Sequence, residues 1–275
     1  MENFTANDGL ILAYRDEGEG LPVLALSGLT RNSDDFNFVA PHLQGVRLIR
    51  MDYRGRGASD WGPHQSYTVP QEAADALGLL DHLGIDRAAI LGTSRGGLIA
   101  MGLAASVKER LLGVCLNDIG PVIDPGGLDY IMGYLGRPPT ARFYKDAAAA
   151  RAHAMAAVGF DDVPMARWEA EVRNLFSQSE TGLKNRYDPA LREAVAEAGA
   201  QPAPDLWPFF DAFQDMPLAL IHGANSDLLT DSTVAEMQRR CPHMLYGRVP
   251  GRGHVPFLDE PEALEVIGTW LDQMR

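Results

Sequence analysis

The sequence predicts an α/β protein in which a mostly parallel, doubly wound sheet carries an inserted cap of helices. Short apolar runs bounded by Gly, Asp or Pro alternate with stretches of helical periodicity, a pattern typical of a parallel sheet covered on both faces. The alternation stops between residues 122 and 205, where alanine-rich segments favour helix. We therefore expect a core formed by residues 1–121 and 206–275 and a helical cap formed by residues 122–205.

Each element of the expected core follows from its local pattern. The run at residues 10–15, closed by a turn that contains glycine, predicts an antiparallel strand at the sheet edge. Further apolar runs predict buried strands at 22–27, 46–52, 88–92, 111–117, 217–222 and 244–249. Apolar residues at three- and four-residue spacing predict helices at 70–83, 95–106, 231–240 and 261–274. Between 122 and 205 strand-like runs are absent, so we expect only helices there.

The composition argues against several classes of protein. The 275 residues include 24 Lys plus Arg and 37 Asp plus Glu, a formal net charge of −13, which repels nucleic-acid phosphates and anionic membrane surfaces. No basic, apolar leader and no apolar stretch of about 18 residues is present, so we expect a cytoplasmic protein. Cys115 and Cys241 form no CxxC pair and no close pair of histidines exists, so we expect neither a metal nor a cofactor. A homodimer is compatible with the apolar content.

The strongest chemical signal is Gly-Thr-Ser-Arg-Gly at residues 92–96, between a predicted strand and a predicted helix. A serine on such a turn, flanked by glycines because the turn leaves no room for side chains, is typical of a nucleophile elbow. The turn also places Ser94 at a helix N-terminus, where free N–H groups favour developing negative charge. Leu98 and Ile99 follow Gly97 where a phosphate-binding loop needs Lys and Ser or Thr, which argues against that loop.

A serine nucleophile needs a base, and we expect a carboxylate and then a histidine to follow it at the sheet edge, in the chain order Ser, Asp, His. Asp227 follows the predicted strand at 217–222, and His254 lies in a glycine-containing loop after the next strand. Asp231 is a rival of Asp227 for the orienting carboxylate, but its place at a predicted helix start indicates capping of that helix. We therefore predict Ser94, Asp227 and His254 as the catalytic residues.

Four ordered segments make the chain similar to the alpha/beta-hydrolase superfamily. Besides the elbow, residues 27–30 (Ser-Gly-Leu-Thr) correspond to that family's His-Gly oxyanion loop, residues 52–60 to its Asp-x-Arg-Gly-x-Gly-x-Ser segment, and residues 253–256 to its histidine loop. The resemblance covers most of the expected core and leaves the cap poorly matched. Ser27 stands where a histidine is usual, which changes the support of the loop more than its chemistry.

The resemblance implies an alpha/beta-hydrolase fold and an acyl-transfer mechanism. In such a mechanism His254 takes the proton of Ser94, the serine attacks a carbonyl carbon, and Asp227 orients the imidazole. The resemblance assigns the oxyanion hole to the backbone N–H groups of Leu29 and Arg95. Because these donors belong to the backbone, we expect the substitution Leu29→Ala to be mild.

The same residues fit several reactions. We expect a hydrolase that cleaves a small or medium carboxylic ester or lactone with water and without a cofactor. Carbon–carbon bond hydrolases of the meta-cleavage product type, enol-lactonases and cofactor-free perhydrolases share these residues and stay open as alternatives. The alternative from another class is a ligand-binding protein that keeps the fold without turnover.

Arg95 is unusual because it places a cation at the start of a helix, where the helix dipole disfavours one. Two interpretations account for it. Arg95 forms an ion pair with a carboxylate of a loop or of the cap, or it lies at the mouth of the pocket and binds a substrate carboxylate.

Other polar residues have structural interpretations. We expect Asp52 and Asp60 to pair with Arg54 or Arg56 and to brace the loop that they share. We expect His222 to form a hydrogen bond within its own loop.

Overall fold

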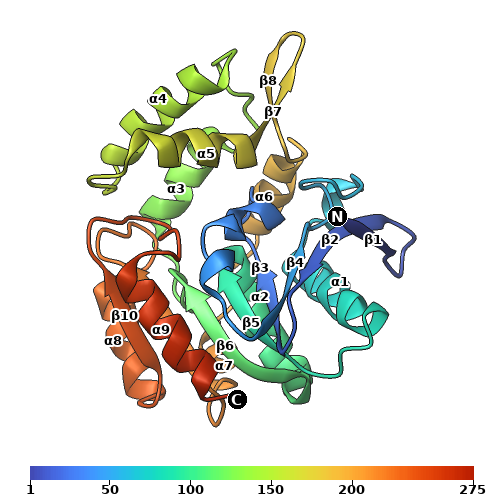
Figure 1. Cartoon of the computed structure of the whole chain (residues 1–275), viewed down its shortest axis with the longest axis vertical. Coiled ribbons are helices and arrows are strands. Elements are labelled where there is room, and N and C mark those ends of the chain that lie inside the picture. Colours follow the sequence, from blue (N-terminus) through green and yellow to red (C-terminus); the bar gives the residue numbers. More distant parts are fainter.

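A central sheet of eight strands organises the computed structural model, which describes residues 1–275. The strand order is β1-β2-β4-β3-β5-β6-β9-β10, and every pair from β4 to β10 is parallel, whereas β1 and β2 are antiparallel to their neighbours. The strands are β1 Glu2–Thr5, β2 Ile11–Glu17, β3 Leu21–Leu26, β4 Val46–Met51, β5 Ala88–Thr93, β6 Leu111–Asn117, β9 Leu218–Gly223 and β10 Leu245–Val249. Figure 1 shows the sheet in the lower half of the molecule.

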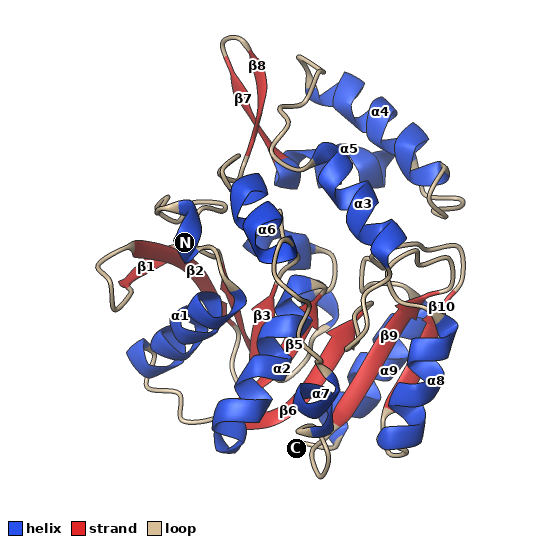
Figure 2. Cartoon of the chain, turned by 180° about the vertical axis from the view of Figure 1, so that it is seen from behind, coloured by secondary structure: helices blue, strands red, loops and turns tan.

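Helices cover both faces of this sheet, because its side chains alternate between the faces and both sets are apolar. Leu24 and Leu26 of β3 belong to an apolar cluster with α1, α2 and α8, whereas Val23 and Ala25 belong to a second cluster with α9. Figure 2 shows α1 and α2 in front of the strands. The core helices are α1 Val69–His82, α2 Arg95–Val107, α7 Trp207–Asp211, α8 Asp231–Arg240 and α9 Pro261–Asp272. The mostly parallel, doubly wound sheet predicted from the sequence is confirmed.

The predicted core strands and helices agree with the structure to within about two residues, but the edge of the sheet differs. The run at 10–15 forms part of β2, which is antiparallel to β4 as expected. The outermost strand is β1, which the sequence did not predict and which pairs with β2. β1 has four residues, of which only Phe4 is buried, so it contains no apolar run that could reveal it.

The elements between β6 and β9 lie over the carboxyl edge of the sheet, above it in Figure 1. They are α3 Pro125–Tyr134, α4 Tyr144–Ala156, α5 Met165–Leu175, β7 Phe176–Ser179, β8 Gly182–Asn185 and α6 Leu191–Gly199. We propose that residues 122–205, which contain these elements, form the cap. The expectation of helices alone in this segment is wrong, because β7 and β8 pair as an antiparallel hairpin. Strands of four residues are too short to show a clear period in the sequence.

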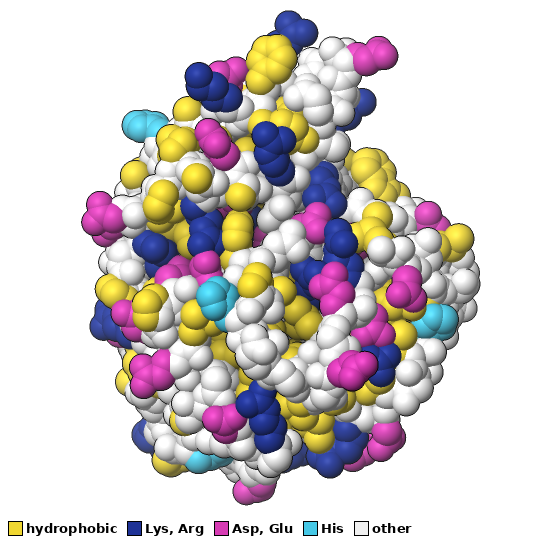
Figure 3. Space-filling model, viewed as in Figure 1, with side chains coloured by type: hydrophobic (Ala, Val, Ile, Leu, Met, Phe, Trp, Pro, Cys, Tyr) yellow, Lys and Arg dark blue, Asp and Glu magenta, His cyan; other side chains and the backbone are white.

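The cap packs against two loops at the carboxyl edge of the sheet. Phe257, in the loop after β10, makes edge-to-face contacts with Phe160 and with Trp168 of the cap, each at a ring-centroid distance of 5.7 Å. Arg31, in the loop after β3, pairs with Glu171 of α5 at 2.9 Å. Figure 3 shows basic and acidic side chains next to one another along the junction of cap and core. No helix combines the length and apolar character that crossing a membrane requires.

Candidate active site

Ser94 lies on the sharp turn between β5 and α2, with a φ angle of +50°. Two close backbone approaches make glycine necessary on either side of it. A Cβ atom at Gly92 would lie 2.7 Å from the carbonyl oxygen of Gly96, and a Cβ atom at Gly96 would lie 2.0 Å from the carbonyl oxygen of Leu26. Both distances are shorter than van der Waals contact, so the turn that presents the serine at the sheet edge requires these glycines.

His254 connects Ser94 to a buried carboxylate. Its Nε2 atom lies 3.0 Å from Oγ of Ser94, and its Nδ1 atom lies 2.7 Å from Oδ2 of Asp118. A carboxylate at Nδ1 favours the tautomer that carries its proton there, which leaves Nε2 free to accept the hydrogen bond of the serine hydroxyl. The structure therefore brings together Ser94 and His254, which are 160 residues apart in the chain.

Asp118 follows β6 directly, is fully buried, and has a φ angle of +55°. Its Oδ1 atom accepts a hydrogen bond from the backbone N–H of Gly223 at 2.8 Å, and its Oδ2 atom accepts one from the hydroxyl of Ser226 at 2.7 Å. Both donors belong to the end of β9 and the loop that follows it. These contacts fix the orientation of the carboxylate that faces His254, and they compensate for its burial.

The prediction that Asp227 partners His254 is wrong, because Asp118 occupies the position at Nδ1. Asp227 is exposed and lines the mouth of the cavity next to Ser94. β6 and β9 are neighbours in the sheet, so the residues after both strands reach the same edge. The signal that could have identified Asp118 is present in the sequence, since it directly follows the predicted strand at 111–117 and precedes His254 in the chain.

The side chain of Arg95 turns away from the cavity, so its predicted contact with substrate is wrong. Its guanidinium pairs with the buried Glu72 of α1 and donates to the carbonyl oxygen of Tyr67 at 2.9 Å. The predicted ion pair is therefore confirmed, but its expected partner in a loop or in the cap is wrong, because Glu72 belongs to a helix of the core. Glu72 supplies the negative charge that a cation at the start of α2 needs.

The loop after β3 lies beside the nucleophile. A Cβ atom built on Gly28 would be 3.8 Å from Cβ of Ser94. The backbone N–H groups of Leu29 and Arg95 donate to no acceptor within the chain. The carbonyl oxygen of Leu29 accepts a hydrogen bond from Nε of the buried Arg56 at 3.0 Å, which anchors the loop to the core. Two free donors are thus held close to Ser94.

A cavity opens between the core and the cap at Ser94 and His254. Core residues Leu29 and Arg31 line one side, and cap residues Tyr134 and Arg151 line another. The mixture of apolar and charged groups is typical of a site that holds a small organic molecule in one orientation.

The expected brace between arginines and the acids of the 52–60 loop is wrong. Asp52 accepts hydrogen bonds from the backbone N–H groups of Ser33 and Ala58 at 2.7 and 2.9 Å, and Asp60 accepts one from the N–H of Ile11 at 2.9 Å. The arginines reach carboxylates of α1 instead, in the pairs Arg54–Asp75 and Arg56–Glu72, at 2.6 and 2.8 Å.

His222 is buried and takes no part in the chain of hydrogen bonds at Ser94. Its Nε2 atom lies 2.9 Å from the carbonyl oxygen of Leu229, in the loop after β9, and its Nδ1 atom lies 3.1 Å from the hydroxyl of Tyr246. Residues 1–275 contain no group of three or more His, Cys, Asp or Glu side chains placed to hold a metal ion.

Comparison with known proteins places the chain in a family. A family model described as the alpha/beta hydrolase fold matches residues 22–261 of the chain. The chain belongs to the alpha/beta hydrolase family. The match includes Ser94, Asp118 and His254, and the family resemblance read from the sequence is confirmed.

Relatives of this alpha/beta hydrolase have named activities. The chain is 34% identical over 267 residues to the 3-hydroxybutyrate-oligomer hydrolase of Cupriavidus necator, covering 93% of this chain and 90% of that protein. It is 27% identical over 275 residues to the N-formylmaleamate deformylase of Pseudomonas putida, covering 98% and 96%. A solved alpha/beta hydrolase from Novosphingobium aromaticivorans superimposes with a TM-score of 0.91 at 35% identity, covering 99% and 97%. The protein is an alpha/beta-fold hydrolase.

Proposed function

We propose that the protein hydrolyses carboxylic esters through an acyl-enzyme on Ser94. The observation that carries this proposal is the continuous chain of hydrogen bonds from Ser94 through His254 to Asp118, with distances of 3.0 and 2.7 Å. A serine hydroxyl is a weak nucleophile until a base accepts its proton, and a base in this position becomes more effective when a carboxylate stabilises its charged form.

The proposed reaction has two steps. Ser94 attacks the carbonyl carbon while His254 takes the hydroxyl proton, and the imidazolium then returns that proton to the leaving alcohol. A water molecule, activated by the same imidazole, attacks the acyl-enzyme and releases the acid. In both steps Asp118 holds the imidazole in place and balances its positive charge.

The oxyanion formed in each step needs hydrogen-bond donors. We assign this role to the backbone N–H groups of Leu29 and Arg95, because both lie beside Ser94 and neither has an acceptor within the chain. Loss of one such donor costs roughly 100- to 1,000-fold in rate in serine hydrolases. The guanidinium of Arg95 has no part in this role, since Glu72 holds it.

The first substrates to test are linear esters of short hydroxy acids. The support for this choice is the similarity to a 3-hydroxybutyrate-oligomer hydrolase over nine-tenths of both chains. A small lactone is the second choice, and a ring-fission diketone tests the carbon–carbon alternative.

The decisive experiment is labelling with a fluorophosphonate, followed by turnover of this panel. We expect the wild type to be labelled and to hydrolyse at least one ester, and we expect the Ser94→Ala variant to do neither. A folded wild type that stays unlabelled and cleaves no member of the panel would favour the ligand-binding alternative. Faster turnover of the diketone than of every ester would replace ester hydrolysis with carbon–carbon cleavage.

A further inference from the structure

Two arginines from different parts of the chain line the cavity that contains Ser94. Arg31 lies in the loop after β3, two residues beyond Leu29, and Arg151 lies on α4 of the cap. Neither was singled out by its sequence pattern, because they are 120 positions apart and belong to no motif. The fold places both residues on the wall of one cavity.

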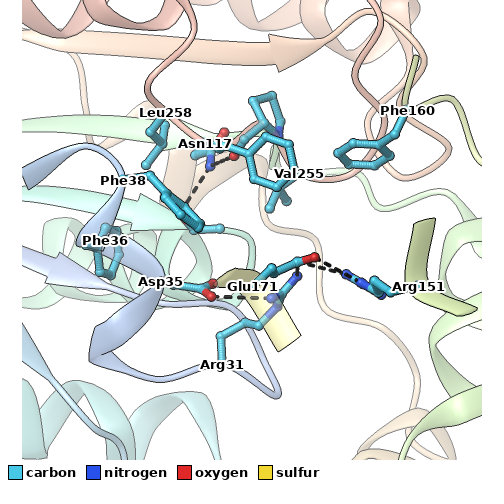
Figure 4. Close-up of a pocket in the computed structure, with 13 residues that line it drawn as sticks. Arg31, Asp35, Phe36, Phe38, Asn117, Arg151, Phe160, Glu171, Val255 and Leu258 are labelled. Carbon is cyan, nitrogen blue, oxygen red and sulfur yellow. Dashed lines mark hydrogen bonds and ion pairs between the residues drawn. The ribbon is translucent and has the colours of Figure 1, made fainter. Parts of the chain in front are cut away.

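A buried carboxylate holds the two arginines in position. Glu171 of α5 accepts from Nη2 of Arg31 at 2.9 Å, and from Nε and Nη2 of Arg151 at 3.2 and 3.1 Å. Figure 4 shows Glu171 between the two guanidiniums, with Asp35 on the other side of Arg31. Burial opposes the charge of Glu171, but the facing guanidiniums outweigh it and lower the pKa of this carboxyl to about 2. Glu171 therefore stays ionised at neutral pH.

The bases of this cluster reach the cavity at Ser94, whereas the acids do not. Arg31 and Arg151 line both the cavity at Ser94 and an adjoining cavity, whereas Glu171 and Asp35 line only the adjoining one. A guanidinium has five N–H donors, and the contacts with Glu171 and Asp35 use two of the nitrogen atoms of each arginine. Each side chain thus retains N–H groups beyond those that its carboxylate partners accept.

We propose that Arg31 and Arg151 bind a free carboxylate of the substrate, so that the enzyme selects esters that carry an ionised acid group in addition to the scissile bond. This inference rests on the proposed ester hydrolysis at Ser94. A pair of fixed guanidiniums offers several charge-assisted hydrogen bonds to a planar anion. Their partners already hold them in place, so little side-chain freedom is lost when the anion binds.

A purely structural role for the same residues makes a different prediction. If the cluster only fastened the cap to the core, removal of one arginine would lower the activity on charged and neutral esters equally. If the arginines bind substrate, the loss is confined to substrates with a free carboxylate. Pairs of substrates that differ only in this group separate the two roles.

The experiment compares each acid with its methyl ester. The first pair is 4-nitrophenyl hydrogen adipate and 4-nitrophenyl methyl adipate, with the carboxylate on the acyl side and spontaneous hydrolysis subtracted. The second pair is the linear dimer of 3-hydroxybutyrate and its methyl ester, with the carboxylate on the alcohol side. The proteins are the wild type, Arg151→Gln and the control Arg173→Gln, which changes an exposed cap arginine that stacks on Tyr144.

We expect the wild type to prefer the free acid of at least one pair by about tenfold or more in kcat/KM. In Arg151→Gln the kcat/KM for that acid falls by about 10- to 100-fold, the scale of lost hydrogen bonds to a charged group, while the methyl ester changes less than about threefold. Arg173→Gln keeps the wild-type preference. Equal loss on both members of a pair, or no preference for either acid in the wild type, would overturn the inference.

A binding measurement keeps this test independent of turnover. Calorimetry with Ser94→Ala measures the Kd of adipate directly, and Arg151→Gln in that background is expected to weaken it by about tenfold or more. The carboxylate site would be contradicted if Arg151→Gln left the Kd unchanged. It would also be contradicted if neither adipate nor 3-hydroxybutyrate bound detectably to Ser94→Ala. Lack of fluorophosphonate labelling would contradict the proposed ester hydrolysis at Ser94. The calorimetric Kd would still test the carboxylate site, because it requires no turnover.

Discussion

Nδ1 of His254 lies 2.7 Å from Oδ2 of Asp118, a buried residue that directly follows β6. Asp227, which follows β9, is exposed at the cavity mouth. The two aspartates come from neighbouring strands and reach the same edge of the sheet. Their different environments lead to opposite predictions for the same amide substitution.

The substitution Asp118→Asn is expected to lower kcat by about 1,000- to 10,000-fold, because an amide neither selects the required tautomer of His254 nor stabilises its charged form. The matched substitution Asp227→Asn is expected to change kcat by less than about threefold. Steady-state kinetics on the best ester, with circular dichroism to verify folding, measures both. A larger loss in Asp227→Asn than in Asp118→Asn would contradict the assignment.

The elbow is expected to tolerate no side chain at Gly96. A Cβ atom there would lie 2.0 Å from a carbonyl oxygen of β3, so Gly96→Ala should lower the free energy of unfolding by about 3 kcal/mol or more. Gly102 lies on the same helix with nothing within 4 Å of its Cβ position. Gly102→Ala should raise stability by roughly 0.5–1 kcal/mol. Urea unfolding tests this contrast, and similar effects at both positions would argue against crowding as the cause.

Arg95→Met is expected to act on stability and not on substrate choice. The substitution removes the guanidinium that Glu72 and the carbonyl oxygen of Tyr67 share, which should cost about 1–3 kcal/mol. The ratio of kcat/KM between acidic and neutral esters should stay as in the wild type, since this side chain faces away from the cavity. A change in that ratio with unaltered stability would restore Arg95 as a substrate contact.

Glu171 is expected to make the stability of the junction between cap and core depend on pH. Its pKa in the folded protein, about 2, lies below the ordinary value of 4.5, so it binds fewer protons when folded than when unfolded. The resulting stability is fully present above about pH 4.5 and is lost as the pH falls through 2. At pH 7 the contribution is on the order of 3 kcal/mol.

Urea unfolding of the wild type and Glu171→Gln at several pH values measures this dependence. The difference in unfolding free energy should be largest near neutral pH and should shrink steadily below pH 4.5. Glu180→Gln, an exposed change in the cap, is the control and should differ little from the wild type at any pH. A wild-type advantage that stays constant down to pH 3 would show that the ion pairs with Arg31 and Arg151 do not depress this pKa.

The local sequence pattern is sufficient to predict an element whose structure depends mainly on its own residues. The buried strands and the long core helices show the periods of their elements, and the turn at Ser94 shows the glycines that its crowded backbone requires. The exceptions are short. β1 and the hairpin of β7 and β8 have strands of four residues, and their pairing depends on partners rather than on an apolar run.

The ion-pair partners of charged residues could not be predicted from the local sequence pattern. Arg95 pairs with Glu72, 23 positions earlier, and Arg31 pairs with Glu171, 140 positions later. A charged side chain attracts any opposite charge that is close to it. Which charges lie close together depends on how the helices and the cap pack against the sheet. The sequence therefore offers Arg95 as one candidate for a cation at the substrate pocket, whereas the fold places Arg31 and Arg151 there.

The amino-acid sequence alone determined the parallel sheet, the elbow serine and the histidine loop, because hydrophobic period and glycine spacing are properties of neighbouring residues. Only the tertiary structure decided which aspartate faces His254. The residues after β6 and β9 reach one edge of the sheet, and the choice depends on the left-handed backbone at Asp118 and on donors from the β9 loop. Those contacts exist only after two distant strands have paired. The position of each aspartate after its own strand makes it a candidate, but only these contacts decide between the two.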